Sequence, residues 1–338
     1  MKRIGDATRR DGCGRERRTG LMIVSALLLL LGTDVFGLDT IYLAITPGKN
    51  FQHVIYPIAQ EKGYMREEGI DLKILIIGGT PSIQGLLAES IQFTVAGTSA
   101  LIAVGKGAAP LKVVLAANDK VHQWLLSKPN ITSPMSLKGR RIVTGGAAAS
   151  ATFMLKQILA RHGLDPNREV AYIHQTGGNQ LHALLAGAVD AAIVGVQERY
   201  VGVDAGMKEL FFLGNKVRNS WGTLATSDRL IREQPKQVSG FIRAAVKALR
   251  LVRQDREATI AAHVKFSRIN RSLVTRMYDD LIGTFTRNGT VDEETQKNDL
   301  AIIGQIANVP EPLPMGRAYD FSFAYAAERQ LDQTGWRP

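Results

Sequence analysis

At residues 175–195 the sequence reads QTGGNQLHALLAGAVDAAIVG, and three structural signals follow one another in it. A glycine pair near its start predicts a polar turn. Three leucines at helical spacing, ended by Gly187, predict a short helix. The small apolar residues 189–194 then predict a buried strand, which ends at Gly195. The stretch therefore predicts a turn, a helix and a strand in close succession.

The same order of signals occurs earlier in the chain. A predicted strand ends at Ile77, the segment 78–80 turns, and a helix precedes a second strand at residues 91–96. The triplet Leu-Leu-Ala stands in both helices, at 86–88 and at 184–186. Because the order of elements matches as well as the triplet, we predict two lobes of one architecture. The alternative is a chance resemblance in a chain rich in Ala, Leu and Gly.

The first 37 residues predict a secretory signal peptide. Several arginines precede the apolar run Leu21–Leu31, which is too short for a resident membrane helix. Small residues follow it at the positions that a signal peptidase reads, so we expect cleavage after Gly37. An uncleaved anchor and a misread start are the alternatives. The predicted location of the remaining chain is the periplasm.

Composition excludes several classes of function. The single cysteine, Cys13, lies in the predicted leader, so the remaining chain has no disulfide, no thiol nucleophile and no cysteine metal site. Without the leader the formal charge is about +8, which favours anionic ligands or an acidic membrane surface unless it is spread over solvated faces. No basic run is interleaved with aromatic residues, so nucleic-acid binding is not expected.

Strands that alternate with helical patterns predict mainly parallel sheets. The chain of 338 residues is long enough for two domains. We expect it to change lobe around residues 118–127 and to return with a strand at 219–226. The most strongly amphipathic helix begins at Pro235, and its apolar stripe Val238–Val252 is predicted to be core. Further helices are predicted at about 256–266, 272–286, 293–307 and 317–331.

Candidate ligand contacts lie where strands end and helices begin. In open parallel sheets this is the edge at which ligands bind, and free backbone N–H groups at helix starts suit an anion. The candidates are Thr46, Asn50, Phe51, Thr80, Gly97, Thr98 and Ser99 in the first lobe, Gly146, Ser150, Gln175 and Gln197 in the second, and Trp221 at a crossing. The alternative for the hydroxyl residues is that they only cap helices. For Trp124 and Trp221, stacking on a ligand and packing at the crossing both remain open.

The sequence lacks the patterns of several catalytic sites. The six histidines show no metal-ligand spacing, and no glycine-rich nucleotide loop or nucleophile elbow is present. No nucleophile–base pair is evident either. We therefore expect no catalytic residue, no metal and no cofactor.

A set of segments occurs in an order typical of one family. They are the strand and loop at 41–51, the segment 63–71, the turn 77–80, the strand and turn at 93–99, and the segments 137–141, 235–250 and 319–323. In these segments the chain resembles the solute-binding proteins of ABC importers for sulfonates, nitrate, taurine and the pyrimidine precursor of thiamine. The resemblance covers nearly all of the chain after the leader.

The resemblance implies a type II periplasmic-binding-protein fold. Two α/β lobes would be joined by two hinge strands, near 115–127 and 217–226, with a helical C-terminal segment packed on lobe 1. Lobe 1 would comprise 38–120 and 221–338, and lobe 2 would comprise 121–220. By position, the family's contacts would fall on Thr46–Phe51, Thr80, Gly97–Ser99, Gly145–Ser150 and Gly195–Gln197.

The implied function is that of a monomeric, extracytoplasmic binding protein. It would capture a small anionic or heterocyclic organic ligand between the lobes and deliver it to the membrane permease of an ABC importer. No arginine stands at the strand ends for a sulfonate, and Ala147–Ala149 makes one turn less polar than an anion site. The cysteine-rich run of the pyrimidine-making yeast relatives is absent too. The alternatives are a ligand-presenting sensor component, an orphan binding protein, and an enzyme of the same fold, for which only Lys49 is suitably placed.

Overall fold

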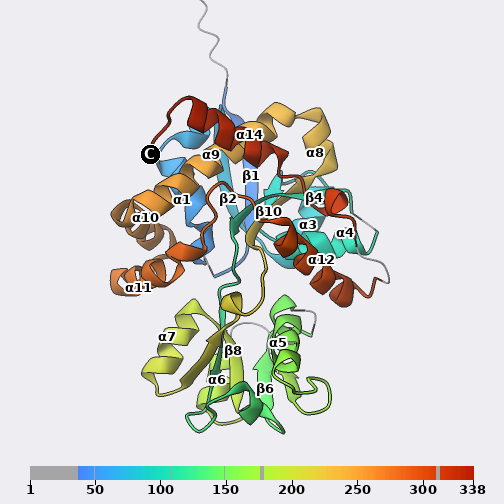
Figure 1. Ribbon diagram of the computed structural model, residues 1–338. Coiled ribbons are helices and arrows are strands. Elements are labelled where there is room, and N and C mark those ends of the chain that lie inside the picture. The colour runs from blue at the N-terminus through green and yellow to red at the C-terminus, as the bar shows by residue number, and fades with distance from the viewer. Residues whose placement is uncertain (1–36, 49, 108, 148, 176–178, 310–312) are drawn as a thin grey trace, which may run out of the picture. The chain divides into compact units, whose positions relative to one another are not determined.

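Two five-stranded sheets organise the chain, and Figure 1 shows each with its helices. The computed structural model describes residues 37–48, 50–107, 109–147, 149–175, 179–309 and 313–338. The predicted signal peptide and Lys49 lie outside these residues. Within them, no helix is both long and apolar enough to cross a membrane.

The two sheets have the same topology. The first sheet has the order β2-β1-β3-β10-β4 and the second has the order β7-β6-β8-β5-β9. In each sheet a single strand, the fourth in the order, is antiparallel to its neighbours, and it is the strand that arrives from the other lobe. The first sheet comprises β1 (Asp39–Ile45), β2 (Ile70–Ile76), β3 (Phe93–Thr94), β4 (Leu111–Asn118) and β10 (Trp221–Ser227); the second comprises β5 (Gln123–Ser127), β6 (Arg141–Thr144), β7 (Ala171–His174), β8 (Ala191–Gly195) and β9 (Lys208–Phe212). The predicted repeat of one architecture is therefore confirmed.

We use the term first lobe for the first sheet with its helices, and second lobe for the second sheet with its helices. The first lobe contains η1 (Phe51–Val54), α1 (Ile55–Glu61), α2 (Tyr64–Glu67), α3 (Gly79–Leu87), α4 (Gly97–Gly105), α8 (Asp228–Glu233), α9 (Pro235–Gln254), α10 (Arg256–Ser267), α11 (Arg271–Leu281), η4 (Ile282–Thr284), α12 (Glu293–Ala307), α13 (Met315–Ala318) and α14 (Ser322–Gln333). The second lobe contains η2 (Pro134–Leu137), α5 (Ser150–Arg161), α6 (Gln180–Leu185), α7 (Val196–Asp204) and η3 (Leu213–Asn215).

Helix α9 provides much of the first lobe's core. Every residue of its predicted stripe from Val238 to Val252 is buried, as expected. Phe241 stacks on Phe93 of β3 with ring centroids 4.1 Å apart. Each such buried side chain stabilises the fold by about 1.5–3 kcal/mol. The stripe is thus core, and it fixes α9 against the sheet.

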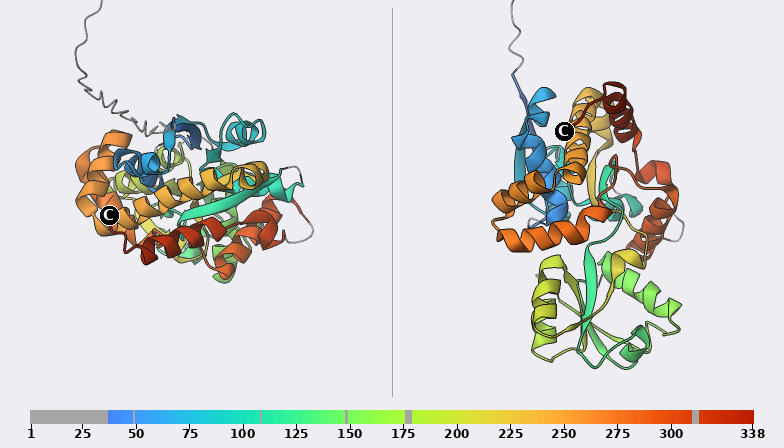
Figure 2. Two further views of the ribbon diagram at one scale, coloured as in Figure 1. Left: turned by 90° about the horizontal axis from the view of Figure 1, so that it is seen from above. Right: turned by 60° about the vertical axis from the view of Figure 1, so that its left-hand side comes forward.

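The C-terminal helices pack on the first lobe, and Figure 2 shows α14 beside α9 in both views. The Arg250 guanidinium and the Asp332 carboxylate join the two helices at 2.6 Å. The single helix predicted at 317–331 is wrong, because the chain forms α13 and α14 with an extended segment between them. Tyr319 in that segment pairs with Val113 of β4, so its backbone leaves the helical conformation.

The chain crosses between the lobes at residues 119–122 and 216–220. Helix α12 of the first lobe holds the second crossing through Asp299, which is fully buried and accepts hydrogen bonds from Asn219, Ser220 and Tyr319. Burial raises the pKa of this carboxyl to about 7, although the donated hydrogen bonds lower it. Ile302, one turn further along α12, joins the hydrophobic core of the second lobe.

Candidate ligand-binding site

Two adjoining pockets lie between the lobes, beside the crossings. Their volumes are about 420 Å³ and 160 Å³, and both are lined by Asn50, Gln52, Gln123 and Trp221. The larger pocket is also lined by Thr46, Pro47, Val95, Ala96, Gly97, Thr98, Ser99, Ile102, Ala149, Ser150, Ala151 and Thr223, and the smaller by Gly48, Phe51, His122, Gly195, Val196, Gln197 and Glu198. Each pocket therefore receives residues from both lobes, as a ligand site between two lobes requires.

Three helices begin at these pockets, and their first N–H groups are not capped. Helix α4 of the first lobe and helices α5 and α7 of the second start there, and no side chain bonds the N-terminus of any of the three. Side chains cap α8, α10, α11 and α12, whereas α3, α6, α9 and α14, which do not begin at the pockets, have no side-chain cap either. Uncapped N–H groups and the helix dipole favour an acceptor atom on a ligand.

The capping alternative for the hydroxyl residues is therefore wrong. Thr98 is the second residue of α4, Thr80 is the second residue of α3 and Ser150 is the first residue of α5, and the caps are Ala96, Gly78 and Ala149. No side chain makes a capping hydrogen bond in these three helices, and alanine and glycine could not make one. The hydroxyls of Thr98, Thr80 and Ser150 are therefore not N-caps.

Two glycines allow the backbone beside the pockets to pack closely against the hinge strand β10. A Cβ atom on Gly97 would lie 1.9 Å from Thr223 Oγ1, so only glycine lets α4 approach β10 this closely. Gly222 has φ +59°, a conformation that side chains rarely adopt, and it follows Trp221 directly. Larger residues at these two positions would displace the pocket wall.

Trp221 and Gln123 each present a polar atom without a partner. The indole Nε1 of Trp221 and the amide Oε1 of Gln123 are both buried and have no hydrogen-bond partner among the described residues. Leaving such an atom unpaired costs about 1–3 kcal/mol. Both side chains line both pockets, so a ligand with a donor and an acceptor would satisfy them.

The charges at the pockets are few. Among the lining residues that the structure describes, Glu198 is the one carboxylate, and none is Lys or Arg. His122 is buried, and burial lowers its pKa to about 3, so the ring is neutral at ordinary pH. Its Nε2 lies 2.8 Å from Thr284 Oγ1, which also accepts from Asn118. The described lining therefore has no cationic side chain for an anion.

Most of the predicted contacts lie at the pockets. Nine of the twelve line one pocket or both: Thr46, Asn50, Phe51, Gly97, Thr98, Ser99, Ser150, Gln197 and Trp221. Thr80, Gly146 and Gln175 line neither. Thr80 and Gln175 follow β2 and β7, which are the outermost strands of their sheets. The ends of these strands are separated from the hinge strands by the strands between them.

Phe51 lines the smaller pocket, and its other contacts are with the first lobe. Its side chain is fully buried and packs edge-on against the rings of His263, Tyr278 and Phe285. It thus supports the loop that carries Asn50. Of the two tryptophans, Trp124 stacks on Phe212 at 4.5 Å and is core, whereas Trp221 faces the pockets.

Sequence reasoning missed Gln52, Gln123 and Thr223. Gln123 opens β5 immediately after the first crossing, and Thr223 lies in the returning strand. The signal of Gln123 and Thr223 was their place beside the crossings, since a cleft between two lobes includes the hinge as well as the strand ends.

A further groove of about 780 Å³ lies beside the crossings and is lined by several cations. Most of these already have partners. Arg218 pairs with Asp292 at 2.7 Å, Arg253 donates to the Phe285 carbonyl at 2.5 Å, and Lys120 donates to Asn215 at 2.9 Å. Because these cations are used internally, the groove is a weaker candidate than the two pockets.

Comparison with known proteins identifies the family. The family model described as "NMT1/THI5 like" matches residues 50–259, which is more than half of the chain. The chain belongs to the NMT1/THI5-like family. The matched segment begins at Asn50 and runs through both crossings, so it includes most of the lining of the two pockets.

A curated relative of this NMT1/THI5-like chain is the riboflavin-binding protein RibY of Chloroflexus aurantiacus. It is 26% identical over 227 residues, which are 63% of this chain and 62% of the relative. The chain thus spans less than two thirds of the length of the relative that it matches.

Solved structures show the same fold. The putative periplasmic sulfonate-binding protein SsuA of Methylobacillus flagellatus KT has a TM-score of 0.74 and 16% identity, and covers 89% of this chain and 98% of its own. The desulfurization enzyme DSZB has a TM-score of 0.63 and 16% identity, and covers 86% of this chain and 99% of its own. The chain therefore has the predicted periplasmic-binding-protein fold, and this fold carries both binding and enzymatic activity.

Proposed function

We propose that this protein is an extracytoplasmic solute-binding protein of an ABC importer. It acts as a monomer in the periplasm after removal of residues 1–37, captures a small organic molecule between its lobes, and presents it to a membrane permease. The observation that carries the proposal is the pair of pockets lined from both lobes, where three uncapped helices begin and buried polar atoms of His122, Gln123 and Trp221 lack partners. RibY and SsuA, named as binding proteins, support it.

The proposed ligand is a ring-bearing molecule with both donors and acceptors. Trp221 Nε1 requires an acceptor and Gln123 Oε1 requires a donor. Nitrate and the sulfonate group offer acceptors alone, and the Glu198 carboxylate repels them. The indole face of Trp221 suits a planar ring. From the sequence, an anionic or a heterocyclic organic ligand is expected. The heterocyclic class therefore fits the pockets better than nitrate or a sulfonate.

We propose binding rather than catalysis. Thr46 Oγ1 lies 3.2 Å from His53 Nε2, a hydroxyl–imidazole pair beside the larger pocket that resembles a nucleophile and its base. However, burial lowers the pKa of His53 to about 3, and its Nδ1 has no described partner to orient the ring. A base needs a pKa nearer the working pH. The pair therefore positions Thr46.

A thermal-shift screen of residues 38–338 tests this function. The panel contains riboflavin, pyrimidines, aromatic carboxylates, alkyl and aryl sulfonates, taurine and nitrate. A ligand that binds only the folded protein raises its melting temperature in a saturable way. We expect a heterocycle to do so and to be recovered unchanged by mass spectrometry. A chemically altered ligand would instead indicate an enzyme, and no shift with any compound would overturn the importer function.

Two tryptophan variants locate the site. Trp221→Phe keeps an aromatic ring but removes the indole N–H, so we expect the ligand to bind about tenfold more weakly. Trp336→Phe is the control, because Trp336 packs on Tyr64 in the first lobe and lines neither pocket. Equal affinities of the two variants, measured by calorimetry, would show that the ligand binds elsewhere.

A further inference from the structure

Helices α7 and α11 form a polar contact between the second and first lobes. Asp280 of α11 accepts a hydrogen bond from Arg199 Nη1 at 2.5 Å and another from the Tyr200 hydroxyl at 2.6 Å, both of α7. Hydrogen bonds to a charged group are stronger than neutral ones. One carboxylate of the first lobe thus holds two neighbouring residues of the second.

A second point of contact lies one helical turn away. The guanidinium of Arg276 lies 4.1 Å from the centroid of the Tyr200 ring, and its Nη1 is 3.6 Å from Asp204. Residues four apart share one face of a helix, so Arg276 and Asp280 face α7 together. Tyr200 therefore meets α11 by both its ring and its hydroxyl. We call these five residues (Arg199, Tyr200, Asp204, Arg276 and Asp280) the α7–α11 contact.

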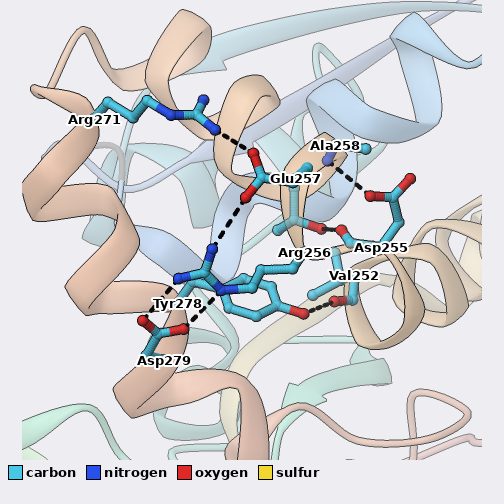
Figure 3. A network of polar contacts seen from close by, with 9 residues as sticks. Val252, Asp255, Arg256, Glu257, Ala258, Arg271, Tyr278 and Asp279 are labelled. Atoms are coloured by element: carbon cyan, nitrogen blue, oxygen red, sulfur yellow. Dashed lines mark hydrogen bonds and ion pairs between the residues drawn. The ribbon is translucent and has the colours of Figure 1, made fainter.

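Helix α11 is fixed to the first lobe by the residues next to Asp280. Figure 3 shows Asp279 paired with Arg256 of α10 and Tyr278 directed at the carbonyl of Val252. Arg256 bonds both carboxylate oxygens of Asp279 at 2.9 Å. Two consecutive aspartates thus have different tasks, because Asp279 anchors α11 within its own lobe and Asp280 reaches the other lobe.

Helix α7 links this contact to the ligand pocket. Its first turn carries Gln197 and Glu198, which line the smaller pocket, and Arg199 and Tyr200 follow directly. Arg199 is held in the second lobe by Glu209 at 2.5 Å and lies 5.1 Å from the Trp124 ring. A displacement of α7 from α11 would therefore move the pocket wall with it.

We propose that the α7–α11 contact is a closure latch, which holds the second lobe in the position where both lobes line the pockets. The inference rests on the proposed ligand-binding function and names its regulation. Arg199 and Asp280 remain 20% and 41% exposed, so their contact is of moderate strength and can break repeatedly. Opening of the latch is the step that frees the ligand, and its residues are positioning residues that do not touch the ligand.

The test compares Asp280→Asn with its neighbour Asp279→Asn. Spin labels at Lys62→Cys in the first lobe and Ala186→Cys in the second report the distance between lobes without any ligand; both positions are exposed, and residues 38–338 contain no cysteine. We expect Asp280→Asn to broaden the distance distribution toward longer values. Asp279→Asn is expected to lower thermal stability and to leave the distribution unchanged.

Ligand kinetics give a second readout. We expect Asp280→Asn to raise the dissociation rate about two- to fivefold, and Tyr200→Phe to have a smaller effect that disappears in the Asp280→Asn background. An unchanged distance distribution in Asp280→Asn overturns the latch, whether or not a ligand is known. A broadened distribution in a protein that binds none of the panel would support the latch and overturn the binding function.

Discussion

The two lobes meet at two places that differ in kind. At the α12 contact, Asp299 is buried among donors from the second crossing and Ile302 lies in the core of the second lobe. At the α7–α11 contact, only Tyr200 is buried, and the other four residues are charged and remain partly open to solvent. A buried contact is costly to break, whereas exposed ion pairs contribute little each. We therefore expect α12 to act as the pivot and α7 to move.

The largest expected effect is that of Asp299→Ala. The substitution leaves donors of Asn219, Ser220 and Tyr319 unpaired in the interior, so we expect the free energy of unfolding to fall by about 3–5 kcal/mol. Chemical denaturation measures it. Glu293→Ala, at an exposed position of the same helix, should cost less than about 0.5 kcal/mol. Similar losses for the two variants would contradict the assignment of α12 as a buried pivot.

Removal of the apolar part of the pivot should come next. Ile302→Ala deletes a side chain that is 1% exposed, and we expect a loss of about 2–5 kcal/mol. Ile260→Ala, fully buried within the first lobe, should cost a similar amount. Only Ile302→Ala should change the distance between the spin labels. The comparison fails if both variants, or neither, alter that distance.

The pH dependence of stability separates Asp299 from the exposed carboxylates. Its pKa is about 7 in the folded protein and about 4 in an unfolded chain. Between these values the folded state keeps a proton that the unfolded chain has lost, so this group's contribution is present at low pH and decreases as the pH rises toward 7. We expect the difference in unfolding free energy between wild type and Asp299→Ala to be larger at pH 5 than at pH 8. Equal differences would show that the carboxyl titrates normally.

The smallest effect is expected at the edge of the latch. Asp204 is 65% exposed and lies 3.6 Å from Arg276, so Asp204→Asn should change the free energy of unfolding by less than about 0.5 kcal/mol. Its effect on ligand dissociation should be smaller than that of Asp280→Asn. A larger effect would move the centre of the latch from Asp280 to Arg276.

Much of the fold follows from local patterns. Gly187 after α6, the repeated strand–helix–strand order and the stripe of α9 are visible in the sequence because each reflects a period or a turn. The break at Tyr319–Phe321 was not visible. It depends on pairing with Val113 and on a hydroxyl bond to Asp299, and both partners are distant in the chain.

The candidate site was predicted in part. Thr98 and Ser150 follow from the rule that ligands bind at strand ends, and the pockets do lie there. The same rule named Thr80 and Gln175, since it does not distinguish an inner strand from an outermost one. Gln123 lines the pockets because it lies directly after the first crossing. Closeness to a crossing identifies a pocket residue only when the position of the hinge is known.

The sequence by itself determined the two-lobed architecture, the core of α9 and the helix starts that carry the small hydroxyl residues, because these depend on neighbours within a few turns of chain. The tertiary structure alone decided which helix starts meet at one cavity, which polar atoms are left without partners, and that Asp279 and Asp280 serve different lobes. Such pairings join residues that are far apart along the chain, and their energies depend on burial and distance, which a linear pattern does not contain.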